Sequence, residues 1–343
     1  MKTVYVGLSG GVDSSVTAAL LKDAGYRVVG AYMKNWSKDL PGFECPWKED
    51  YLDAKRVAVQ LGIDFQLFDF EEQYKSKVVD YMIEAYKVGT TPNPDIMCNQ
   101  EIKFKLFFDT AMLHGADYIA TGHYARTTDG QLRTAKDDSK DQSYFLYRVN
   151  SATLKKTLFP LGDYKKTYVR KLAAQYKLIT ATKKESMGIC FVGKVGIKEF
   201  LSQYVTTQPG PVIDQYGNEI GTHDGAIFYT IGQRHGLGVI GGLPVYVIEK
   251  DIDKNIVYVT SQLDDERLWR TSLRITSPHW INQAPQLGKP YDIRTRHRAP
   301  LARASFKDTL DTLHVDSPVR AITAGQSVVI YEDDRVVGGG IVA

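Results

Sequence analysis

Apolar positions in the first half of the chain follow two alternating spacings. Short runs rich in β-branched and aromatic residues predict strands at residues 3–8, 28–33, 65–70 and 117–121. Apolar residues at helical spacing predict helices over 14–24, 51–61, 71–87 and 101–114. Two prolines and a glycine argue against a helix over 89–99. The alternation predicts an α/β fold with a mostly parallel sheet, helices on both faces, and ligands bound at the carboxyl ends of the strands.

The pattern changes near residue 205. Helical spacing continues over 165–177 and 196–204, and alternating runs then predict antiparallel strands at 245–249, 256–260, 291–296, 327–331 and 336–343. We therefore expect three parts. Residues 1–205 would form the α/β domain, residues 206–268 a small central β-rich domain, and residues 269–343 a second small β domain.

Composition narrows the class of protein. The chain has 343 residues, 43% hydrophobic and 24% charged, which is typical of a globular protein with two or three domains. Three cysteines without a C-x-x-C pair exclude a disulfide scaffold and give little support to a zinc site. No apolar run reaches the ~18 residues of a membrane span. We expect no membrane partner, no signal peptide before the motif that begins at residue 9, and a cytoplasmic location.

Charge is unevenly distributed along the chain. The net charge is only +3, but residues 133–198 contain 15 basic and 5 acidic residues. Such an excess favours a polyanionic partner, with nucleic acid as the first candidate, although a solvated helical surface explains it equally well. Residues 294–303 add four arginines and no acidic residue.

A glycine-rich string, SGGVDSS at residues 9–15, lies between the first predicted strand and helix. Glycines permit a tight turn, and the N–H groups at a helix start bind anions. Asp13 would repel phosphate, so it is better explained as a ligand for Mg²⁺ on a departing pyrophosphate. A serine-capped helix is the ordinary alternative. The string resembles the PP-loop of ATP pyrophosphatases, which implies ATP, Mg²⁺ and adenylation of a carbonyl oxygen.

Two thiols lie in unusual surroundings. Cys98 ends a proline-rich polar segment in which Asp95 could move protons. Cys190 follows Gly188 in a lysine-rich segment that would favour a thiolate. Either thiol alone is more often a small buried residue. Beside a PP-loop, the two together suggest sulfur transfer through a persulfide and a disulfide. Cys45 has no such setting.

Several motifs in one order resemble the family of tRNA-specific 2-thiouridylases. They are SGGVDSS, TPNPDIMCN followed by Gln100 and EIKF, ADYIATGHYAR, KDQSYFL, GICFVG and TIGQRHGLG, and the similarity runs from residue 4 to Gly338–Gly340. The resemblance implies a Rossmann-like PP-loop domain followed by two small, mostly β domains, the last a β-barrel that contacts tRNA. It also implies thiolation of the wobble uridine in the anticodon arm and a persulfide sulfur donor, either a cysteine desulfurase or a relay protein.

The resemblance further implies roles for individual residues. The nucleotide would contact Gly7, Leu8, Ser9, Gly10, Gly11, Val12, Asp13, Ser14, Met33 and Gly122, with Asp13 also holding Mg²⁺ through ATP. The target base would meet Asn93, Pro94 and Asp95, with Asp95 as acid and base, Cys190 as persulfide carrier and Cys98 as resolving thiol. Further tRNA contacts would be His123, Lys140, Asp141, Gln142, Arg296, His297 and Gln326. His297 departs from family versions with tyrosine at that position.

Two kinds of alternative stay open at this point. Other PP-loop enzymes are 4-thiouridine synthases, lysidine synthetases and GMP-type or argininosuccinate-type ligases. The first usually carries an RNA-binding module before the loop, and the others need no pair of thiols. A non-catalytic tRNA-binding protein is the second kind, and intact Asp13, Asp95, Cys98 and Cys190 argue against it.

Overall fold

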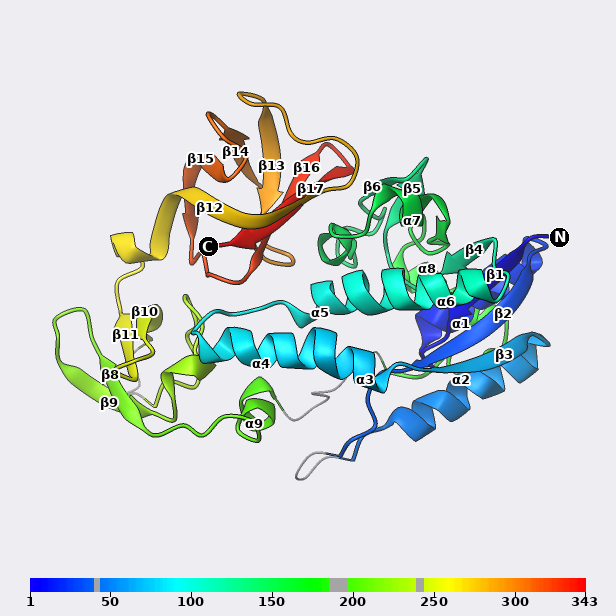
Figure 1. The fold of residues 1–343 in the computed structure, drawn as a ribbon, viewed down its shortest axis with the longest axis horizontal. Helices are drawn as coiled ribbons and strands as arrows, with labels where there is room; N and C mark the ends of the chain where they lie inside the picture. Colours follow the sequence, from blue (N-terminus) through cyan, green and yellow to red (C-terminus); the bar gives the residue numbers. More distant parts are fainter. Residues whose placement is uncertain (40–43, 185–195, 239–243) are drawn as a thin grey trace.

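A parallel five-stranded sheet forms the centre of the first part of the chain (Figure 1). This computed structural model describes residues 1–39, 44–184, 196–238 and 244–343. The strand order β3-β2-β1-β4-β7 reverses direction next to β1, so ligands are expected to bind between the carboxyl ends of β1 and β4. The strands are β1 (Thr3–Gly7), β2 (Arg27–Lys34), β3 (Asp64–Asp69), β4 (Tyr118–Ala120) and β7 (Thr157–Leu158).

Helices cover both faces of this sheet, as predicted. Alternate residues of β1 point to opposite sides of the sheet. Val4 and Val6 therefore pack with α1 and α2, while Tyr5 packs with two longer continuous helical stretches, residues 71–87 and 94–113, on the opposite face. Figure 1 shows those longer helices running side by side away from the sheet. The helices are α1 (Val12–Asp23), α2 (Trp47–Leu61), α3 (Glu71–Tyr74), α4 (Asp80–Lys87), α5 (Pro94–Met97), α6 (Phe107–Leu113), α7 (Ser151–Lys155) and α8 (Lys166–Gln175).

The expectation that residues 89–99 contain no helix is wrong. A helix begins at Pro94, continues through a π-helical segment over Cys98–Leu106, and runs into α6. Proline is tolerated in the first turn of a helix because its missing N–H has no intrahelical acceptor there. The Asn93 side chain caps this start by accepting a hydrogen bond from the Ile96 N–H at 3.3 Å. A second π-helical segment, Lys75–Val79, joins α3 to α4.

The middle of the chain forms a four-stranded sheet in the order β10-β11-β8-β9. Its core contains Val212, Val247 and Val257. Pairing is antiparallel except between β8 and β11, which are parallel, so the expected all-antiparallel arrangement is only partly right. The elements are α9 (Ile197–Leu201), β8 (Gly210–Ile213), β9 (Glu219–His223), β10 (Tyr246–Asp251) and β11 (Ile256–Thr260).

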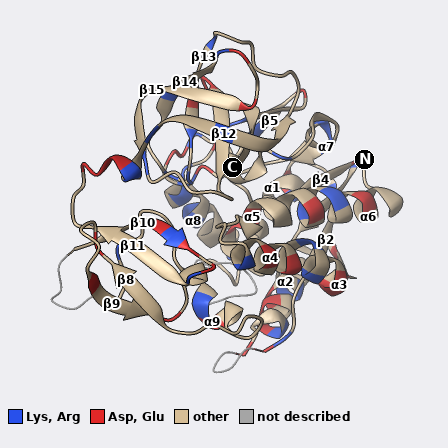
Figure 2. Cartoon of the chain, turned by 60° about the vertical axis from the view of Figure 1, so that its left-hand side comes forward, with Lys and Arg blue, Asp and Glu red and all other residues tan. Residues whose placement is uncertain are grey.

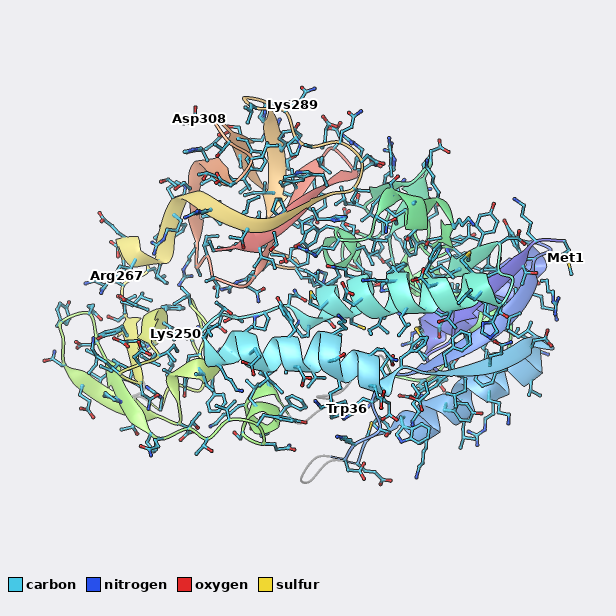
Figure 3. All side chains as sticks on the ribbon, viewed as in Figure 1. Met1, Trp36, Lys250, Arg267, Lys289 and Asp308 are labelled. Atoms are coloured by element: carbon cyan, nitrogen blue, oxygen red, sulfur yellow. The ribbon has the colours of Figure 1, made fainter. Side chains whose placement is uncertain are left out.

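A closed antiparallel barrel ends the chain, in agreement with the prediction. Six strands pair in the order β12-β15-β14-β13-β16-β17, and β17 pairs back with β12. Figure 3 labels Arg267 at the connection from the four-stranded sheet to this barrel. The strands are β12 (Trp269–Trp280), β13 (Pro290–Arg294), β14 (Ala302–Phe306), β15 (Thr312–Arg320), β16 (Ser327–Glu332) and β17 (Arg335–Val342).

The barrel is attached to the first part of the chain by strand pairing. A hairpin of β5 (Arg126–Thr128) and β6 (Gln131–Arg133) extends the barrel sheet, because β6 pairs with β17. The Tyr144 hydroxyl also donates to the Ser327 carbonyl at 2.8 Å, in a buried contact. These contacts link residues on either side of the expected domain boundaries at residues 205 and 268. The division of the chain into three domains therefore stays a prediction. Within the described ranges, no helix is long and apolar enough to span a membrane.

Candidate active site

The glycine-rich turn joins β1 to α1 at the edge where the crevice is expected. Gly11 precedes the first helical residue, Val12, and no side chain caps the helix start. Instead the turn is held internally, because the Ser14 hydroxyl accepts from the Ser9 N–H at 3.2 Å and donates to the Gly11 carbonyl at 3.1 Å. A helix start whose N–H groups lack a side-chain cap is an anion-binding site.

Close backbone packing fixes this turn between neighbouring strands. A Cβ atom on Gly122, just after β4, would lie 2.8 Å from the Ser14 nitrogen. Gly10 has φ +73°, and a Cβ there would lie 2.4 Å from the Asp50 carbonyl oxygen. On β1, a Cβ on Gly7 would lie 3.0 Å from the terminal carbon of Met33. The residues expected to contact the nucleotide therefore lie together.

Asp13 is held by a lysine that sequence analysis missed. The Lys166 ammonium lies 2.7 Å from both carboxylate oxygens of Asp13, and the Tyr124 hydroxyl donates to one of them at 3.0 Å. Lys166 is 8% exposed and opens α8, which contains three basic residues and no acidic one (Figure 2). The Asp137 carboxylate accepts from the Lys166 backbone N–H at 2.8 Å. The only sequence signal for Lys166 was the basic stretch that contains it.

Asp13 fits a magnesium ion carried by a nucleotide better than a metal bound by protein alone. Among the described residues, no group of three or more His, Cys, Asp or Glu side chains could hold a metal ion. Mg²⁺ usually takes one or two carboxylates and completes its shell with phosphate oxygens and water. One carboxylate beside a helix start without a side-chain cap matches that donor set.

The segment that contains Asp95 and Cys98 lies at the start of the α5–α6 helix. Cys98 is buried and packs in the main core. Asp95 is exposed as a residue, but partial removal of water from around its carboxyl raises the pKa of that group. The positive charge of Lys103 opposes this effect. The same Lys103 charge adds to burial in holding the pKa of His123 well below its usual value. Asp95, Lys103 and His123 therefore share one electrostatic neighbourhood.

The predicted tRNA contacts around residues 123–142 are partly built into the core. His123 is 8% exposed and its Nδ1 lies 2.7 Å from the Thr121 hydroxyl oxygen. Asp141 is buried and accepts hydrogen bonds from the Ala135 N–H and the Ser143 hydroxyl. The Gln142 side chain accepts from the Tyr124 N–H at 3.0 Å. Lys140 is half-buried.

The three predicted contacts in the barrel face the other parts of the chain. Arg296 donates to the Ile231 carbonyl at 2.7 Å, and Gln326 donates to the Thr91 carbonyl at 2.8 Å. The His297 ring packs on Phe145 with 4.5 Å between ring centroids. Whether these side chains also contact tRNA stays a prediction.

Cys190 lies outside the described residues. The chain that leads toward it is fixed at Lys183, whose ammonium lies 2.8 Å from the Asp50 carboxylate and 2.7 Å from that of Asp53. Asp50 is the residue whose carbonyl oxygen borders Gly10. Arg170 of α8 also donates to the Lys183 carbonyl at 2.7 Å. Lys183 therefore lies beside the glycine-rich turn.

Protonation of His297 gives a test of the barrel contact. Burial, with the Arg298 and Arg294 charges adding to it, lowers the pKa of His297 to about 4. An unfolded histidine titrates near ~6.5. Stability is therefore complete above that pH and falls as the pH drops toward 4, because the unfolded chain binds the proton first.

We expect His297→Gln to remove this loss, which is at most about 1.4 kcal/mol per pH unit. The measurement is urea unfolding of both proteins at several pH values between 4 and 7. A difference between them that does not change with pH would contradict the assignment.

Family models match the whole course of the chain. Residues 2–194 match the tRNA methyl transferase HUP domain, residues 198–261 the tRNA methyl transferase PRC-barrel domain, and residues 270–342 the aminomethyltransferase beta-barrel domain. Among solved structures, a 4-thiouridine synthetase–RNA complex with bound ATP aligns with 60% of this chain and 50% of that chain, with a TM-score of 0.40 and 18% identity.

Curated relatives are similar over nearly the full length. The tRNA-specific 2-thiouridylase MnmA of Shouchella clausii is 46% identical over 349 residues, which cover 99% of this chain and 96% of that protein. The protein of the same name from Bacillus subtilis is 45% identical over 350 residues, covering 99% and 94%. The chain therefore belongs to the family of tRNA-specific 2-thiouridylases.

Proposed function

We propose that this chain uses ATP to replace the C2 oxygen of the wobble uridine of tRNA with sulfur. The observation that carries the proposal is the α1 start without a side-chain cap, held between β1 and β4 in a chain similar to 2-thiouridylases over its whole length. The anticodon loop is single-stranded, so its uridine can leave the stack and enter a crevice at modest cost.

In the first step, the uridine C2 oxygen attacks the α-phosphorus of ATP. An oxygen–phosphorus bond forms, the bond from the α-phosphorus to the bridging oxygen breaks, and pyrophosphate leaves. The N–H groups of the first turn of α1 lie where they would stabilise charge on the phosphates. Mg²⁺, when bound with the nucleotide, would neutralise part of that charge.

Lys166 is the residue we add to this step. Its ammonium lies 2.7 Å from the Asp13 oxygens, beside the start of α1, and we propose that it moves from Asp13 to a phosphate oxygen when ATP binds. Asp13 would then accept the magnesium ion in place of the lysine. Exchange of one cation for another keeps this carboxylate compensated throughout binding.

In the second step, the terminal sulfur of a persulfide on Cys190 attacks C2 of the adenylated uridine, and AMP leaves. The Cys98 thiolate then attacks the Cys190 sulfur, which forms a disulfide and leaves the transferred sulfur on the base. A thiol reductant must reopen that disulfide before the next turnover. Burial of Cys98 keeps its thiol from other oxidants before the substrate arrives.

Asp95 is our candidate for proton transfer near the base. The pKa of its carboxyl is raised toward neutral pH, and a proton-transfer group works best when its pKa is near the pH of the reaction. Asn93 caps α5 and Pro94 is its first residue, so both are held next to Asp95. We propose that they contact the target base there. The remaining tRNA contacts proposed are His123, Lys140, Asp141, Gln142 and His297.

The partners follow from this chemistry. We propose that a cysteine desulfurase or a relay protein delivers the persulfide sulfur, that the anticodon arm binds the basic stretch at residues 133–198 through its phosphates, and that the protein works in the cytoplasm. We also propose the division into residues 1–205 for catalysis, 206–268 as a central domain and 269–343 as a tRNA-contacting barrel.

Thiol variants separate the two steps. We expect Cys98→Ser and Cys190→Ser to form no 2-thiouridine but to keep tRNA-dependent pyrophosphate release, because adenylation needs neither thiol. Cys45→Ser is the matched control and should thiolate normally. The measurement is mass spectrometry of nucleosides, with pyrophosphate measured in parallel. Full 2-thiouridine from either variant would overturn the thiol roles, and a different thiolated base from the parent would overturn the substrate.

Lys166→Met should affect the opposite step. We expect tRNA-dependent pyrophosphate release to fall by about 10²–10³-fold, the usual loss when one donor to a developing charge is removed. Lys55→Met, which changes an exposed lysine on α2 outside the basic stretch, is the control. Pyrophosphate release at the parental rate from Lys166→Met would refute its role, provided that the two variants unfold at similar temperatures.

A further inference from the structure

Three separate parts of the chain meet beside the segment that holds Asp95 and Cys98. We call this place the domain junction. It consists of Thr91–Pro92 from the α4–α5 connection, Thr230–Gly232 from the central domain, and Ala321–Gln326 from the loop between β15 and β16. Figure 1 shows the α4–α5 connection passing between the four-stranded sheet and the barrel.

The loop between β15 and β16 is hydrogen-bonded to backbone groups of the α4–α5 connection. The Thr91 N–H donates to the Ala324 carbonyl at 2.9 Å. The Gln326 side-chain amide donates to the Thr91 carbonyl at 2.8 Å and to the Pro92 carbonyl at 3.3 Å. Thr91 is only 7% exposed, and its hydroxyl lies 3.3 Å from that of Thr230. The residue that follows Pro92 is Asn93, which caps α5.

Arg296 closes the junction from the other side. One nitrogen of its guanidinium lies 2.7 Å from the Ile231 carbonyl oxygen, 2.9 Å from the Ala321 carbonyl oxygen and 2.8 Å from the Thr323 hydroxyl oxygen, so its two hydrogens are shared among three acceptors. These partners belong to the central domain and to the barrel loop. Arg296 therefore ties the loop that holds Thr91 to a second domain.

We infer that Arg296 and Gln326 are positioning residues. They hold the barrel loop against Thr91–Pro92 and so fix the α5 start with Asp95 and Cys98, instead of acting mainly by direct contact with tRNA. Their donor groups already bond to protein acceptors, which a contact with tRNA would have to replace. The inference rests on the proposed function for what the positioned segment does, but not for the contacts themselves.

Gly325 separates positioning from tRNA contact, because it has no side chain to bind RNA. Its φ is +89°, and an added Cβ would lie 2.9 Å from both the nitrogen and the oxygen of Thr91. Gly325→Ala must therefore push the loop off the connection. Gly288→Ala is the matched control, since Gly288 lies in the same barrel with φ +74° and nothing within 4 Å of an added Cβ. The two variants share the backbone strain and differ in the clash.

The first readout needs no tRNA. Iodoacetamide labelling of Cys98, followed by peptide mass spectrometry, reports how often the buried thiol becomes accessible. We expect labelling to be about tenfold faster in Gly325→Ala than in Gly288→Ala, because the segment opens locally more often. Gln326→Leu should show the same increase, and it keeps the test valid if Gly325→Ala does not fold. A side chain that serves only to bind tRNA would leave labelling of the free protein unchanged.

The second readout is turnover. We expect the kcat for 2-thiouridine formation to fall about tenfold or more in both junction variants, since a small displacement of reacting groups is costly. Their Kd for tRNA should stay within about twofold of that of Gly288→Ala.

Cys98 labelling equal to that of Gly288→Ala in both variants would overturn the inference. If labelling is faster in the two junction variants but the parent protein forms no 2-thiouridine, the proposed function is contradicted while the positioning role of the domain junction is supported.

Discussion

The amino terminus of α1 is the constraint on which the rest of the site depends. No side chain caps it, and it is closely packed, because a Cβ atom on Gly122 would lie 2.8 Å from the Ser14 nitrogen and one on Gly10 would lie 2.4 Å from the Asp50 carbonyl oxygen. An anion-binding site fixed to a parallel sheet gives a nucleotide one position and one direction. In the mechanism we propose, the base, the thiols and the barrel are all arranged around that nucleotide.

Three long-range connections bring these parts together. Lys166 joins α8 to the turn through Asp13, and Lys183, further along the same basic stretch, joins the approach to Cys190 to α2. On the opposite side of the site, the domain junction joins the barrel to the α5 start through Thr91. Each connection spans more than a hundred residues of sequence and uses a charged or amide group with several partners, which makes it specific in geometry.

Local features of this protein could be predicted from its sequence, and contacts between distant residues could not. Four strands of the parallel sheet follow from short-range periodicity and are confirmed, as is the glycine-rich turn, whereas the two-residue strand β7 was not predicted. The helix that begins at Pro94 is not evident from the sequence, because proline breaks most helices and is tolerated only in the first turn. β12 was missed because most of its side chains face solvent, so apolar alternation is weak. Lys166 had no signal beyond a basic stretch, since its partner lies 153 residues away. Cys190 lies outside the described residues, so its role stays a prediction.

In the mechanism we propose, the glycine-rich turn binds the ATP that converts the C2 oxygen of the uridine into a leaving group. Isotope transfer tests it most directly. A tRNA whose wobble uridine carries ¹⁸O at C2 would be thiolated with unlabelled ATP, and the AMP released would be analysed by mass spectrometry. We expect the AMP to contain the ¹⁸O, because the oxygen leaves the base on the α-phosphorus. Unlabelled AMP alongside labelled water would contradict it.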